Sequence, residues 1–89
     1  MHAVVVNVTI GGLDPSEAET LLREQVVPRV SGAPGFVAAY WTRKDNQGLS
    51  MSIWQSEDDA NSASEMVRSA APEGVTVDSV EVREVVASA

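Results

Sequence analysis

Few side chains in this sequence could carry out acid–base or nucleophilic chemistry. The chain contains no Cys, which excludes disulfides, zinc–thiolate sites and thiol catalysis. Its single His, His2, is the only side chain that titrates near neutral pH, and we expect it to be solvated near the chain terminus. One His cannot form a His-based metal site within one chain, so we expect no bound metal. We find no Ser–His–Asp or Cys–His set that would indicate a nucleophilic enzyme.

Asn7 and Trp54 stand out by their positions in the sequence. Asn7 interrupts a segment of β-branched residues. A buried amide needs hydrogen-bond partners, which neighbouring backbone, a β-bulge or a bound molecule can supply. Trp54 ends a strictly alternating segment, and its indole can either fill the core or line a pocket. The residues alone leave both alternatives open.

Three further residues are candidates for binding a substrate. Tyr40 and Trp41 are adjacent in a segment typical of a β-strand, so their side chains point to opposite faces of the sheet. We expect one of them in the core and the other at a pocket or at the rim of a dimer. Met66 lies in the apolar stripe of a predicted helix. We predict that Tyr40, Trp41 and Met66 contact a substrate.

Two charged clusters have simpler interpretations than a site. Glu57, Asp58 and Asp59 fit the first turn of a helix, where acidic residues are favourable, better than they fit a metal site. Arg43 and Lys44 adjoin a predicted turn. They are most simply a solvated hairpin end, and anion recognition is the alternative.

Size and charge limit the classes of function. The chain has 89 residues, which predicts one domain over residues 1–89. It has 6 Lys and Arg against 13 Asp and Glu, a net charge of −7 that disfavours nucleic acids and anionic membrane surfaces. No apolar stretch approaches the roughly 20 residues that span a bilayer. The N-terminus lacks the basic region of a signal peptide, so we expect a cytoplasmic protein.

Hydrophobic patterns predict four strands, over residues 3–10, 36–43, 49–55 and 75–86. The residues 45–48 form a turn, which makes the second and third strands a hairpin. In the last strand the apolar positions change parity near Asp78-Ser79, which indicates a β-bulge.

Capping signals predict two helices. Asp14-Pro15-Ser16-Glu17 begins the first, and Pro28 should kink or end it near Val27. Ser56, with Asp59 three residues later, begins the second, which runs to about Ala70 and is ended by residues 72–74.

The order β-α-β-β-α-β predicts a ferredoxin-like α+β fold, with a four-stranded antiparallel sheet and two helices on one face. Both faces of the first strand are largely apolar. If Ala3, Val5 and Asn7 face the helices, the other face presents Val4, Val6, Val8 and Ile10. An exposed apolar face of this kind marks an interaction surface, so we expect a homodimer with sheet packed on sheet.

Two short motifs in the right topological order carry a family resemblance. They are Pro34-Gly35-Phe36, before the second strand, and Ile53-Trp54-Gln55-Ser56, after the third. Over nearly its whole length the chain resembles the antibiotic-biosynthesis-monooxygenase-like domains of the dimeric α/β-barrel superfamily. The resemblance implies a ferredoxin-like protomer, a two-fold dimer, and a pocket between each sheet and its helices.

The haem-degrading branch of that superfamily has an Asn on the first strand, a Trp ending the third strand and an iron-ligating His on the second helix. Asn7 and Trp54 match the first two features, but Ser64 stands where the His would fall. We therefore expect no haem and no other cofactor.

The resemblance leaves two functions open. In a cofactor-independent oxygenase, Asn7 would bond a substrate oxygen or stabilise an oxyanion, and Trp54 would stack on a small aromatic substrate. The alternative is a non-enzymatic dimeric module that binds a small molecule or has a structural role.

Overall fold

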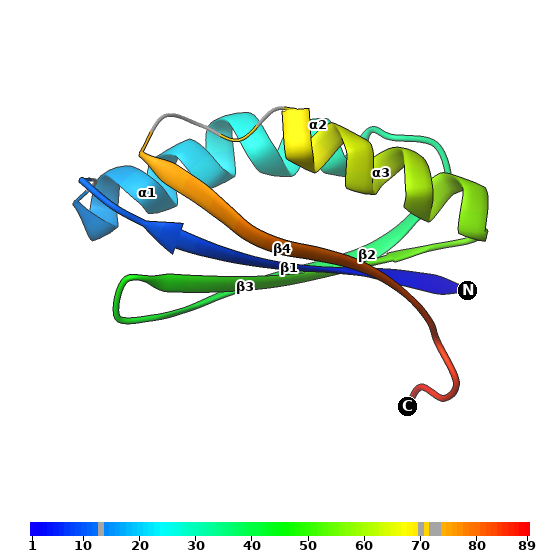
Figure 1. Ribbon diagram of the computed structural model, residues 1–89. Coiled ribbons are helices and arrows are strands. Elements are labelled where there is room, and N and C mark those ends of the chain that lie inside the picture. The colour runs from blue at the N-terminus through cyan, green and yellow to red at the C-terminus, as the bar shows by residue number, and fades with distance from the viewer. Residues whose placement is uncertain (13, 70, 72–73) are drawn as a thin grey trace.

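The computed structural model describes residues 1–12, 14–69, 71 and 74–89. The elements in chain order are β1 (His2–Ile10), α1 (Pro15–Leu21), the π-helical η1 (Leu22–Val26), α2 (Val27–Ser31), β2 (Phe36–Lys44), β3 (Gln47–Trp54), α3 (Glu57–Ser69) and β4 (Val75–Glu84). The strands form one sheet in the order β2-β3-β1-β4, with every neighbouring pair antiparallel. All the described helices lie on one face of the sheet (Figure 1). The predicted ferredoxin-like α+β fold is confirmed.

The helix that joins β1 to β2 passes through Pro28 and ends at Ser31, so of the two predicted outcomes, a kink or an end near Val27, the end is wrong. Its middle turn is π-helical, and the Val27 N–H donates to the carbonyl of Leu22, five residues back. In a regular α-helix, a proline ring collides with the carbonyl four residues earlier. A π turn displaces these carbonyls, which lets the helix continue past Pro28.

The core lies between the sheet and the helices. Its buried residues are Val4, Val6, Val30, Trp54, Ala60 and Ala63. The small Ala60 and Ala63 let α3 approach β1 closely, and Val4 and Val6 fill the space between them. The assignment that turned Asn7 toward the helices is therefore wrong. We call the uncovered side of the sheet the free face, and it carries the alternate β1 residues Ala3, Val5 and Asn7.

The predicted bulge in the last strand is confirmed. Asn7 pairs with Ser79 and Val8 pairs with Val77, so Asp78 is an extra residue opposite β1. This insertion lets the apolar residues on both sides of Asp78 point toward the helices, because one additional residue restores the alternation.

The predicted start of the second helix is also confirmed, because the Ser56 Oγ accepts a hydrogen bond from the Asp59 N–H at 3.1 Å. Ala70, Pro72 and Glu73, which belong to its predicted end, lie outside the described residues. Asp45 and Asn46 form a two-residue turn between β2 and β3, which is shorter than predicted. No helix in the described ranges is long and apolar enough to cross a membrane.

Candidate functional site

The elements α1, η1 and α2 follow one another without a break, and we call them together the first helix. A cavity of about 760 Å³ lies along β2 and β3, on the side of this first helix. The first helix stands off from the sheet, since only its last part, α2, packs closely against a strand, β2. The helix-facing positions of β2 and β3 explain this gap. Four of them carry small residues: Ala39, Gly48, Ser50 and Ser52. Side chains this small cannot fill the space beneath a helix, so a hollow remains between the two layers.

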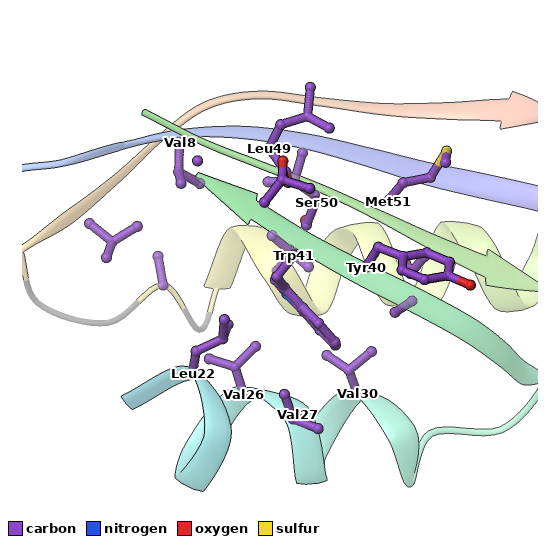
Figure 2. Close-up of a pocket in the computed structure, with 18 of the residues that line it drawn as sticks. Val8, Leu22, Val26, Val27, Val30, Tyr40, Trp41, Leu49, Ser50 and Met51 are labelled. Atoms are coloured by element: carbon purple, nitrogen blue, oxygen red, sulfur yellow. The ribbon is translucent and has the colours of Figure 1, made fainter. Parts of the chain in front are cut away.

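Trp41 occupies the middle of this hollow. Figure 2 shows its indole projecting from β2 toward Leu22, Val26 and Val30 on the helix. The side chain is only partly buried, and α3 contributes Met66 to the lining. An aromatic ring among aliphatic side chains suits a flat apolar molecule, which can stack on the indole and displace water.

Polar groups in the cavity are few. The Ser52 Oγ accepts a hydrogen bond from the Trp54 Nε1 at 2.8 Å, which leaves its own hydroxyl proton available. Ser50 lies two residues away on the same side of β3, within the cavity lining. These hydroxyls can orient a ligand, because each one can either donate or accept a hydrogen bond.

Trp54 itself belongs to the core. Its side chain is 1% exposed, and its ring packs edge-on against Phe36 at a centroid distance of 5.6 Å. Trp54 is also a lining residue of the cavity, but almost all of its surface is buried in the core. The ring that a ligand can reach over a larger surface is therefore Trp41.

Tyr40 and Trp41 point to opposite faces of β2, as predicted. Tyr40 is 67% exposed, and Figure 2 shows its side chain on the other side of the strands from Trp41, together with those of Leu49 and Met51. All three residues are also among those that line the cavity. Tyr40 and Met51 are paired in the β2–β3 register. Together with Val5 and Ile53, these side chains make the free face apolar beside the β2 edge. The predicted interaction surface was the opposite face, with Val4, Val6 and Val8, and these residues instead pack toward the helices.

Asn7 is separated from the cavity by the sheet. Its Nδ2 donates to the Ser79 Oγ at 3.0 Å on the free face. The residues that line the cavity thus include Tyr40, Trp41, Trp54 and Met66 but not Asn7. The catalytic and binding roles given to these residues stay predictions.

His2 is not the solvated terminal residue that the sequence predicted. Its side chain is 23% exposed, and its Nε2 lies 3.4 Å from the Glu57 Oε2 at the start of α3. Its Nδ1 is buried without a hydrogen-bond partner among the described residues. His2 is partly buried because the β1–β3 register places it opposite Trp54, at the end of the core.

The residues present do not fit a histidine-ligated haem. Ser64, at the position of the expected ligand, donates its hydroxyl to the Asn61 carbonyl at 2.7 Å. His2 is not among the described residues that line the cavity. The described ranges also contain no group of three or more His, Cys, Asp or Glu side chains that could hold a metal ion.

Several lining residues were not identified as site residues from the sequence. Leu22, Val26 and Val30 follow each other at intervals of four, and together with Ser50 they line the cavity. The available signal was the run of small residues on one face of the predicted hairpin. It indicates that the helix above that face has nothing to pack against.

Comparison with known proteins supports the fold. The chain is similar to a putative monooxygenase from Shewanella loihica PV-4, with a TM-score of 0.66 and 23% identity over 98% of this chain and 96% of that chain. It is also similar to the heme-degrading protein Rv3592 from Mycobacterium tuberculosis, with a TM-score of 0.52 and 19% identity over 100% and 99%. No protein-family model and no curated protein matches the chain. The likeness confirms the ferredoxin-like fold of the chain.

Proposed function

We propose that the protein is a monooxygenase-like protein that takes a small apolar or aromatic molecule into the cavity between β2, β3 and the first helix. The observation that carries this proposal is the hollow of about 760 Å³ with Trp41 at its centre. A cavity of this size holds a small organic molecule, since ligand sites typically measure roughly 300–1,000 Å³. The two structural neighbours, which include a putative monooxygenase, support the same assignment.

The chemistry that suits this site is oxidation of a substrate that supplies its own electrons. The described lining residues include no Cys or His to act as nucleophile or general base. A phenolic compound with an activated methylene group can react with O₂ without such help. One oxygen atom forms the carbonyl of the product and the other forms water, because the two methylene hydrogens supply two protons and two electrons. The protein would bind the aromatic body, orient the phenol by Ser50 or Ser52, and exclude bulk water.

Oxygen uptake with a hydroxylated anthrone tests the activity. We expect uptake above the rate without protein, and we expect Trp41→Ala to remove most of this increase. Asn7→Ala is the informative comparison, because Asn7 lies on the opposite face of the sheet and outside the cavity. Loss of activity in Asn7→Ala, with Trp41→Ala unaffected, would place the reaction on the free face and contradict the proposal.

A second candidate function is binding without turnover. It is favoured by the same shortage of acid–base groups among the described lining residues. Saturable binding of the anthrone that depends on Trp41, combined with no oxygen uptake above background, would assign the protein to this class.

We also infer that two copies pair through the free face. Tyr40, Leu49 and Met51 are 67%, 44% and 41% exposed, and they lie on adjacent strands. Large side chains exposed together on a sheet are unfavourable in water, and a second copy of the same face would cover them. The partner's sheet would then close the protomer into a dimeric α/β barrel.

A further inference from the structure

The cavity described above has a charge opposite to that of the protein. The chain as a whole carries a net charge of −7, with only six basic residues. Three of the six line this one cavity: Arg23, Arg29 and Arg43. Glu19 is the single acidic residue among the described lining residues, and it is paired with Arg23 at 2.6 Å. Arg29 and Arg43 have no ion-pair partner in the described part of the chain.

Arg43 is the better placed of these two arginines. It occupies a helix-facing position of β2, in register with Gly48 on the cavity wall. Its Nη1 donates to the Pro15 carbonyl at 3.1 Å, across the gap between β2 and the first turn of α1. This bond uses one N–H of the exposed guanidinium beside the cavity, and the other N–H donors of its planar fork stay available for a ligand.

We propose, building on the proposed function, that the ligand of this cavity is an amphipathic anion with an aromatic or aliphatic body and one carboxylate or phenolate end. The body lies against Trp41 and the aliphatic residues of the first helix. The anionic end forms a charge-assisted hydrogen bond with Arg43, which is the type of donor that recognises carboxylates in two-point geometry. Arg29 adds a weaker attraction through its unpaired charge, which steers anions toward the opening.

The charge pattern argues for this class of ligand over a neutral one. In a chain with this net charge, an anion is repelled from most of the surface. A neutral ligand gains nothing from two unpaired arginines beside its binding site, whereas an anion gains both affinity and a faster encounter. The sequence most simply places Arg43 and Lys44 at a solvated hairpin end. Both residues are exposed, but only Arg43 lines the cavity and bonds the first helix.

The test compares 2-naphthoate with its neutral analogue 2-naphthamide by isothermal titration calorimetry at low salt. We expect the parent protein to bind the naphthoate about tenfold more tightly, since only the anion forms a charge-assisted hydrogen bond with the exposed Arg43 guanidinium. Arg43→Gln should remove this preference without weakening the amide, and Arg43→Lys should keep part of it. Lys44→Gln is the matched control, because it removes one positive charge from the neighbouring residue, and both affinities should stay within about twofold of the parent.

The possible results separate this inference from the function on which it rests. Equal binding of the two compounds, or an unchanged preference in Arg43→Gln, would overturn the anion proposal and leave an apolar binding site intact. Failure of both compounds to bind would contradict the proposed function as well. Equal losses of naphthoate affinity in Arg43→Gln and Lys44→Gln would show that only the net charge of the protein matters and would also overturn the role of Arg43.

Discussion

Asn7 and Trp54 lie on opposite faces of the same sheet, and the side chain of each donates a hydrogen bond to a serine hydroxyl. Asn7 donates to the Ser79 Oγ on the free face, and Trp54 donates to the Ser52 Oγ on the helix face. A shared site for the two side chains would require a molecule that passes through the sheet. We therefore propose ligand contact for Trp41, which lines the cavity, whereas Trp54 packs in the core.

The two tryptophans should respond differently to truncation. Trp54→Ala removes a side chain that is 1% exposed, so we expect a loss of about 3–5 kcal/mol in the free energy of unfolding, as for other large core side chains. Trp41→Ala should cost clearly less, because its side chain is only partly buried beside a hollow. Urea denaturation followed by circular dichroism measures both values. A larger loss for Trp41 than for Trp54 would contradict this division of roles.

Gly35, in the Pro34-Gly35-Phe36 motif, should be intolerant of a side chain. It has a φ of 81°, and a Cβ there would overlap the side chain of Asp59 at the start of α3. We expect Gly35→Ala to lower the free energy of unfolding by about 2 kcal/mol or more, from backbone strain and overlap together. Thermal unfolding measures the loss of stability in Gly35→Ala and in a control variant.

The matched control for Gly35 is Gly12→Ala. Gly12 has a similar φ of 77°, but among the described residues, its chain neighbours aside, nothing lies within 4 Å of the position that a Cβ would take. Its substitution should therefore carry only the cost of the left-handed conformation, about 1 kcal/mol. Equal costs at both positions would show that contact with Asp59 contributes nothing.

Ser56 should stabilise α3 as its N-cap. Its Oγ accepts the Asp59 N–H at 3.1 Å, so Ser56→Ala should cost about 1 kcal/mol in the free energy of unfolding. Ser62→Ala, at an exposed position inside α3, is the control and should be neutral or slightly stabilising. Chemical denaturation measures the free energy of unfolding of both variants. A similar change in this free energy for the two would exclude a capping role.

The inferred dimer should be sensitive to charge on the free face. Met51→Asp places a carboxylate in the middle of the apolar surface, so we expect dissociation to monomers that keep their helical and strand content. Ser62→Asp adds the same charge at an exposed α3 position and should leave the assembly unchanged. Light scattering coupled to size-exclusion chromatography measures the masses. A parent protein that is already monomeric would contradict the dimer.

Much of the fold could be predicted because local signals agreed with one another. The capping residue Ser56, the turn at Asp45 and the parity change at Asp78 each act over a few residues, and the structure confirms all three. The helix through Pro28 could not be predicted in the same way. Whether a proline ends a helix depends on the hydrogen-bond pattern of the preceding turn, which the residue types do not fix.

The candidate site was harder to predict, because both faces of β1 are apolar by sequence. Alternation alone groups Val4 with Val6 and Val5 with Asn7, but it does not say which group meets the helices. That choice depends on how closely Ala60 and Ala63 let α3 approach the sheet. The cavity depends in turn on small residues such as Gly48 and Ser50 meeting a helix that is distant in sequence.

The most direct test of the central claim, that the hollow beside Trp41 binds a ligand, is a titration followed by two-dimensional NMR. The chain has two tryptophans, hence two indole N–H signals, and Trp41→Phe assigns them. We predict that 2-naphthoate shifts the Trp41 indole and the methyl groups of Leu22, Val26 and Val30, with little change at Val5 and Ile53, which lie on the free face and are not among the described lining residues. Shifts confined to Val5 and Ile53, or no saturable shift at Trp41, would contradict the account.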